Sequence, residues 1–148
     1  MTQREAEAVQ TAVQPIRIVV EWEGGQRYRG GRPGGPSLLF DGSREAAPGP
    51  VDGVIIALAS CSAFDVVEIL AKRRTPARSL SMTADYTRAE GQIPRRLTGL
   101  HLTFHVATDS GIEHVRRAVA LAVDKYCSVA ASLAPDVRIT SDVELVPS

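Results

Sequence analysis

The sequence predicts an α+β fold in which a mostly antiparallel sheet packs around a long buried central helix, with a second helix nearby. Three observations lead to this prediction. No charge occurs between Val54 and Phe64, in the middle of an apolar run. Segments before and after that run alternate apolar and polar residues, with the period of two that is typical of strands. Finally, residues 111–127 repeat their apolar side chains at helical intervals.

The first strands precede the apolar run. Residues 16–22 alternate apolar and polar side chains, and Gly24-Gly25 followed by a short strand at 27–29 predicts a hairpin. The segment 30–36 consists mainly of Gly and Pro and is interpreted as a loop, with a third strand at 37–40. We expect residues 1–14 to form a flexible tail and residues 15–148 to form a single domain.

The long helix is expected over residues 52–74. Pro50 suits a first helical turn, the cations from Lys72 to Arg74 suit its carbonyl end, and the Thr75-Pro76 step disfavours further helix. Because no charge interrupts its middle, the helix is predicted to be buried on all sides. At about 1.5 Å per residue it would be roughly 35 Å long, so a partner subunit would help to cover it.

The rest of the chain completes the sheet and adds the second helix. Residues 80–87 and 100–106 each have one apolar face and are interpreted as strands. Ser110 and Glu113 have the spacing of a capping box, which predicts a helix from 111 to 127. A further turn is expected at 129–133, and residues 137–145 are interpreted as the last strand.

Composition limits the classes of partner. The chain has 17 basic and 17 acidic residues and a formal net charge of zero, so nothing drives it towards nucleic acid or an anionic membrane. Its first residues are polar and lack the apolar core of a signal peptide, and the longest apolar run is interpreted as too short to span a bilayer. We therefore expect a cytoplasmic protein that binds neither nucleic acid nor membrane.

Two cysteines and two histidines are the candidates for chemistry. Without an export signal, Cys61 and Cys127 are not expected to form a structural disulfide, and each is interpreted either as a small apolar residue or as a reactive thiol. His101 and His105 share a strand face but would stand roughly 13 Å apart at about 3.3 Å per residue. They cannot bind one ion together, and no other cluster with metal-ligand spacing occurs in the sequence.

Two motifs carry a resemblance to a known family. The first runs from Gly49-Pro50-Val51-Asp52 through the apolar helix to Cys61-Ser62-Ala63-Phe64-Asp65-Val66-Val67, and the second is Asp124-Lys125-Tyr126-Cys127-Ser128-Val129. Both motifs, their separation and the order of elements resemble the OsmC/Ohr family of thiol peroxidases, and within it the OsmC-like branch. The resemblance covers roughly residues 16–145.

This resemblance implies an OsmC-like fold and an intertwined homodimer whose two active sites are each lined by both chains. It implies that Cys61 attacks an organic hydroperoxide, or less readily hydrogen peroxide, and becomes a sulfenic acid. Cys127 then resolves this acid as an intramolecular disulfide, which a dithiol such as a lipoylated protein reduces. The implied role is defence against oxidative stress, without metal or cofactor.

The family also uses an arginine from the first hairpin and a glutamate ten residues before the first cysteine. Here Arg27 and Arg29 are the candidates for the arginine, while Val51 occupies the glutamate position and Asp52 is the nearest acid. Asp65, one turn after Cys61, either opposes a thiolate or orients the cation. An alternative function is an OsmC-like small-molecule-binding or redox-sensing protein without peroxidase turnover.

Overall fold

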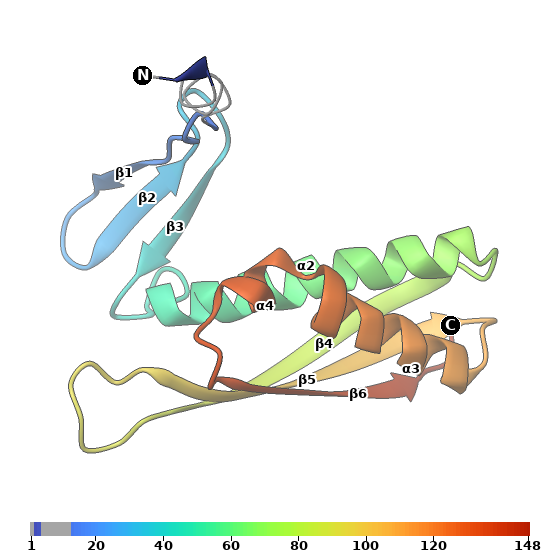
Figure 1. The fold of residues 1–148 in the computed structure, drawn as a ribbon. Helices are drawn as coiled ribbons and strands as arrows, with labels where there is room; N and C mark the ends of the chain where they lie inside the picture. The colour runs from blue at the N-terminus through green and yellow to red at the C-terminus, as the bar shows by residue number, and fades with distance from the viewer. Residues whose placement is uncertain (1, 4–12) are drawn as a thin grey trace. The chain divides into compact units, whose positions relative to one another are not determined.

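The chain divides into two compact units, residues 1–50 and residues 51–148, in the computed structural model. The structure describes residues 2–3 and 13–148, and Figure 1 shows the elements of each unit. The predicted tail at 1–14 therefore lies largely outside the described residues. The single domain expected over residues 15–148 stays a prediction, and each unit is described below by itself.

The first unit is a three-stranded antiparallel sheet in the order β1-β2-β3. It consists of β1 (Val19–Trp22), β2 (Arg27–Gly31) and β3 (Ser37–Asp41). Gly24 and Gly25 form the first turn with φ of 96° and 55°, a region that glycine enters without steric cost. The expected strand start at residue 16 is wrong, because β1 begins at Val19. Val19 pairs with Gly31, the last residue of β2, so residues 16–18 have no residue of β2 to pair with.

Asp41 organises the loop that follows β3. Its carboxylate is 1% exposed and accepts hydrogen bonds from the Ser43 hydroxyl at 2.6 Å, the Ser43 amide at 2.9 Å and the Ala46 amide at 3.0 Å. The Ser43 hydroxyl, followed by the Ala46 amide, lowers the pKa of Asp41 to about 2, and Arg27 adds a smaller effect of the same sign. The loop is thus folded around a carboxylate that stays ionised.

The second unit packs its helices on one face of a three-stranded sheet, as Figure 1 shows. In chain order it contains α2 (Pro50–Lys72), β4 (Ala77–Arg88), β5 (Leu97–Thr108), α3 (Ile112–Leu121), a π-helical turn η1 (Ala122–Tyr126), α4 (Ser128–Ser132) and β6 (Arg138–Leu145). The sheet order is β4-β5-β6. The β4–β5 pair is antiparallel and the β5–β6 pair is parallel, so the expected α+β fold with mostly antiparallel sheet is confirmed.

Alternation along β5 divides the sheet into an apolar and a polar face. The apolar face carries Leu100, Leu102, Phe104 and Val106, which pack against the helices as part of the buried core. Burying each such side chain contributes about 1.5–3 kcal/mol. On the other face, His101 Nδ1 lies 2.7 Å from Thr140 Oγ1, and His105 Nδ1 lies 3.0 Å from Glu144 Oε2. In the described residues no His, Cys, Asp and Glu side chains cluster as a metal site.

Helix α2 is buried along one stripe. The buried residues are Ile55, Leu58, Ser62, Val66 and Leu70, which recur every three or four positions as expected for one helical face. Phe64 is 66% exposed and Ile56 is 52% exposed. The prediction of burial on all sides is therefore wrong for a single chain, because one sheet can cover only one side of a helix.

The length and apolar composition of α2 bear on the prediction that no apolar run is long enough to span a bilayer. The helix has 23 residues, and an 18-residue window within it has a mean hydropathy of 2.1. Only 28% of that window is buried. By length and composition alone it could cross a bilayer, so the expectation that no segment is long enough is wrong. A core helix that a second protein surface covers has the same composition.

The expected helix at 111–127 is broken into shorter pieces. α3 gives way after Leu121 to the η1 turn, and the chain restarts as α4 after Cys127. The N-cap of α3 is Gly111 without a side-chain cap, so the predicted capping box with Ser110 is wrong. Ser110 stands one residue too early for a cap, and its buried hydroxyl has no partner among the described residues.

Candidate functional site

The two cysteines face each other from different elements of the second unit. Cys61 lies in α2 and is partly buried, whereas Cys127 lies between η1 and α4 and is 3% exposed. Both are free thiols in the structure. Packing of the η1–α4 segment against α2 therefore brings together two cysteines that are far apart in the sequence.

The π-helical turn sets the position of Cys127. Its amide donates to the carbonyl oxygen of Ala122, five residues earlier, at 2.8 Å, and this wider turn interrupts the helix. Cys127 then becomes the N-cap of α4, where its Sγ accepts a hydrogen bond from the Ala130 amide at 3.4 Å. The same Sγ donates to the carbonyl oxygen of Leu58 at 3.9 Å. The thiol is thus held between α2 and α4.

Burial raises the pKa of the Cys127 thiol, and a hydrogen bond and charge interaction with Cys61 raise it further. The bond from the Ala130 amide acts in the opposite direction. The raised pKa favours the protonated thiol, with burial as the main cause and Cys61 as a further one. Two neighbouring free thiols of this kind can form a disulfide if their geometry adjusts to that of the bond.

The serines on either side of Cys61 have their hydroxyl groups bound to the helix backbone. Ser60 donates to the Ile56 carbonyl at 2.7 Å and Ser62 donates to the Leu58 carbonyl at 3.0 Å. Such bonds to the carbonyl four residues earlier often bend a helix. The Leu58 carbonyl oxygen accepts hydrogen bonds from both the Ser62 hydroxyl and the Cys127 thiol. No periodic pattern in the sequence predicts the second of these bonds.

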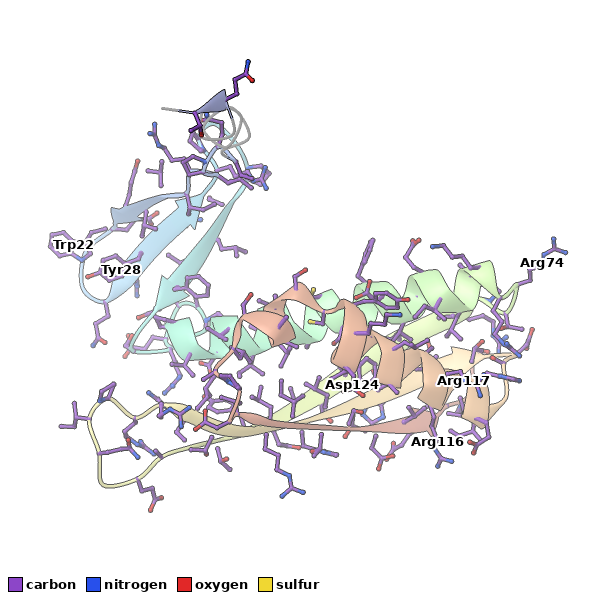
Figure 2. All side chains as sticks on the ribbon, viewed as in Figure 1. Trp22, Tyr28, Arg74, Arg116, Arg117 and Asp124 are labelled. Atoms are coloured by element: carbon purple, nitrogen blue, oxygen red, sulfur yellow. The ribbon has the colours of Figure 1, made fainter. Side chains whose placement is uncertain are left out.

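Arg27 and Arg29 both lie on β2 in the first unit. Arg27 Nε is 3.5 Å from a carboxylate oxygen of Asp41, and Arg29 is bound to Glu23. Between them in sequence, Tyr28 pairs across the strands with Trp22, and Figure 2 shows these two aromatic side chains close together. Each arginine is thus held by an acid of its own unit, and its role towards Cys61 stays a prediction.

Asp52 lies in the first turn of α2, where the hydroxyl of Tyr86 donates to its Oδ1 at 2.8 Å. At about 100° per residue, the nine positions from Asp52 to Cys61 place the two side chains on opposite sides of the helix. α2 therefore does not bring Asp52 beside Cys61 within one chain. Asp65, by contrast, follows Cys61 by one turn on the same side. Tyr86 was absent from the predicted site because only the packing of β4 on α2 reveals it.

Comparison with known proteins supports one family. The OsmC-like protein family matches residues 41–142. Protein YhfA of Escherichia coli K12 is 39% identical over 129 residues, which cover 86% of this chain and 96% of that protein.

Solved structures agree on the fold. A hypothetical protein from Aquifex aeolicus is 20% identical with a TM-score of 0.80, and the match covers 92% of this chain and 99% of that one. An organic hydroperoxide resistance protein OsmC from Legionella pneumophila is 17% identical with a TM-score of 0.67, covering 90% and 99%. The resemblance carried by the two cysteine motifs is confirmed, and the chain belongs to the OsmC-like protein family.

Proposed function

We propose that this protein is a cysteine-based peroxidase that reduces organic hydroperoxides, and less readily hydrogen peroxide, in the defence of the cytoplasm against oxidative stress. The observation that supports this most directly is the position of the Cys127 thiol against α2, where its Sγ lies 3.9 Å from the carbonyl oxygen of Leu58, one helical turn before Cys61. Family membership adds support, since one structural relative is an organic hydroperoxide resistance protein.

The first chemical step uses Cys61, which is more accessible than Cys127. Its thiolate attacks one oxygen of the hydroperoxide, forming an S–O bond while the O–O bond breaks. The alkoxide leaves and takes up a proton, giving an alcohol and the sulfenic acid of Cys61. The substrate is reduced by two electrons and the sulfur is oxidised by two.

The second step uses Cys127. Its sulfur attacks the sulfenic sulfur of Cys61, an S–S bond forms, and hydroxide leaves and is released as water with the proton of the Cys127 thiol. Part of what keeps Cys127 protonated is the charge interaction with Cys61. That part disappears when the Cys61 thiolate becomes a neutral sulfenic acid, so oxidation of Cys61 favours ionisation of Cys127. An external dithiol, such as a lipoylated protein, then reduces the disulfide by exchange.

The proposal includes a homodimer. Exposed apolar residues on α2 are Val54, Ile56, Phe64 and Val67. Exposed apolar side chains gathered on the uncovered side of a helix mark an interaction surface, and a second copy of the chain would cover them. Each site would then be built from both chains, which is how an arginine of one chain could reach a cysteine of the other.

The activating cation is assigned to Arg27 or Arg29. A cation near Cys61 would stabilise the thiolate, which is the reactive form. Replacing the correct arginine by methionine, which is of similar length and uncharged, should slow oxidation of Cys61 at least tenfold. The same change at Arg32, further along the chain, serves as the control.

Single-turnover consumption of cumene hydroperoxide by fully reduced protein tests the whole scheme. We expect rapid loss of peroxide that requires Cys61, with a Cys61–Cys127 disulfide as the product. Cys61→Ser should abolish the reaction, and Cys127→Ser should leave one turnover that stops at sulfenic acid. Consumption no faster than that of a free thiol would contradict the proposal.

A redox-sensing protein without turnover is the second candidate. It is favoured by the pairing of both candidate arginines with acids, Arg27 with Asp41 and Arg29 with Glu23. In that case oxidation would give the same disulfide, but a dithiol reductant and excess hydroperoxide would not sustain repeated cycles. Steady-state assays with dihydrolipoamide separate the two candidates.

A further inference from the structure

A hollow of about 240 Å³ lies on the β4-β5-β6 sheet of the second unit. Six of the residues that line it alternate along the strands with apolar core positions, and so lie on the face of the sheet away from the helices (Figure 1). They are Asp85, Thr87, Gly99, His101, Arg138 and Thr140. The volume is below the range for drug-sized ligands, so the hollow suits a smaller molecule.

The pairing of the strands places these six residues in two rows. One row runs across the sheet from Asp85 through His101 to Thr140, and the next runs from Thr87 through Gly99 to Arg138. The rows are roughly 6.6 Å apart, at about 3.3 Å per residue. Gly99 has no side chain, and a Cβ at this position would stand 3.2 Å from Thr87 Oγ1. The backbone of Gly99 therefore forms the floor of the hollow.

The first row presents hydrogen-bond acceptors. The Thr140 hydroxyl donates its proton to the Leu100 carbonyl oxygen at 3.4 Å, so its oxygen accepts the Nδ1 proton of His101 at 2.7 Å. In a neutral imidazole with its proton on Nδ1, Nε2 is an acceptor. The Asp85 carboxylate is the next acceptor in this row, and its side chain forms no hydrogen bond or ion pair with any described residue. This row suits a positively charged group with several donors.

The second row presents donors. The guanidinium of Arg138 carries five N–H groups and no acceptor, and within the described part of the chain it has no acidic partner. A carboxylate can accept two of these N–H groups in parallel. Opposite charges therefore stand at two corners of the hollow, Asp85 on β4 and Arg138 on β6.

We propose that the hollow binds a small zwitterion, an amino acid whose ammonium and carboxylate are separated by about three methylene groups, since the rows are roughly 6.6 Å apart. The ammonium group binds between the Asp85 carboxylate and Nε2 of His101. The carboxylate binds the guanidinium of Arg138, and the carbon chain crosses Gly99 between the two rows. Each charged end of the ligand thus meets a group of opposite charge.

This site is distinct from the thiol site of the same chain. Cys61 lies in α2 and Cys127 packs against α2, whereas the hollow lies on the face of the sheet away from the helices. Binding of the zwitterion therefore requires neither cysteine. It should persist in the Cys61→Ser, Cys127→Ser double variant, so a failure of the peroxidase proposal would leave this one standing, and the reverse also holds.

The test uses three probes with similar carbon chains and different ends: 4-aminobutanoate, butanoate and butylammonium. Titrations at constant ionic strength are followed by backbone amide shifts in two-dimensional NMR spectra of the full chain. We expect 4-aminobutanoate to bind about fivefold more tightly than either singly charged probe, which is the advantage that one further exposed ion pair can give. The largest shifts should occur at Gly99 and His101.

Three variants locate the two charges and the hollow. In Asp85→Asn, 4-aminobutanoate should lose its advantage over butanoate and keep its advantage over butylammonium. In Arg138→Gln the pattern should be reversed. Gly99→Val fills the hollow and should abolish binding of all three probes. Asp142→Asn, the same change as the first on the same face of the sheet but outside the hollow, should bind the probes as the native chain does.

Several results would overturn the proposal. Absence of binding, or equal affinity for 4-aminobutanoate and a singly charged probe, would exclude a site for both charges. An equal loss of preference in Asp85→Asn and Asp142→Asn would indicate a general effect of surface charge, and shifts confined to residues outside the sheet would place the ligand elsewhere. If Gly99→Val does not fold, the comparison of Asp85→Asn with Arg138→Gln decides the question by itself.

Discussion

The thiol of Cys127 donates a hydrogen bond to the carbonyl oxygen of Leu58, which lies one helical turn before Cys61 in α2. This contact crosses from the end of the π-helical turn to the central helix. It fixes the buried cysteine beside the accessible one, and Ser62 shares the same carbonyl. The backbone of α2 therefore takes part in positioning the thiol pair.

Removing Cys61 should lower the pKa of Cys127. A hydrogen bond and charge interaction with Cys61 contribute to raising that pKa, although burial is the larger cause. In Cys61→Ala the pKa of Cys127 should fall but remain above its ordinary value. Thiolate absorbance near 240 nm measured against pH provides the check, with the Cys61→Ala, Cys127→Ala double variant as the blank. An unchanged or higher pKa would show that the two thiols do not interact in solution.

Acid should destabilise the loop around Asp41. The pKa of this carboxyl is lowered to about 2 in the folded chain, first by the Ser43 hydroxyl, whereas a free aspartate titrates near 3.9. The folded state therefore gains stability from ionised Asp41 above about pH 4, and this gain is lost as pH falls towards 2. Asp41→Asn should unfold at a lower temperature than the native chain at pH 7.

The difference in melting temperature between Asp41→Asn and the native chain should shrink between pH 4 and pH 2. Glu45→Gln, in the same loop, is the matched control. Among the described residues, the Glu45 carboxylate forms neither a hydrogen bond nor an ion pair. A difference that stays constant over this pH range would contradict the assignment of the acid sensitivity to Asp41.

The exposed apolar side of α2 should determine the oligomeric state. Phe64 is 66% exposed, and placing a charge there would leave an unpaired carboxylate in an apolar interface, at a cost of several kcal/mol. Phe64→Glu should therefore shift a homodimer to monomer, as measured by sedimentation equilibrium. Phe64→Leu should remain dimeric. A native chain that is monomeric at every concentration would refute the dimer.

The core of the second unit should be sensitive at Phe104. This side chain is fully buried on the apolar face of β5, and Phe104→Ala should lower the free energy of unfolding by about 3–5 kcal/mol because it leaves a cavity. Ile93→Ala should change it by less than about 0.5 kcal/mol, since Ile93 is 99% exposed. Urea denaturation of both variants measures the contrast, and equal effects would place Phe104 outside the core.

The α+β class, the central helix and the two candidate cysteines could all be predicted from the order of the residues alone. Period-two alternation predicted the first strand and the strands that became β4 and β5, because one face of each such strand is apolar, while Gly24-Gly25 predicted the hairpin with β2. Proline at the start and cations at the end marked α2 within two residues of its observed bounds. Short-range rules suffice for such features, since they depend on neighbouring residues alone.

The features that depend on contacts between distant residues could not be predicted and appear only in the folded chain. The register of β1 against β2 moved the strand start to Val19, and the π-helical turn broke the second helix before Cys127. The contact of Asp52 with Tyr86, and that of Cys127 with Leu58, join residues far apart in the chain. No local pattern encodes such pairs, because they form only when the hydrophobic faces of helix and sheet pack together.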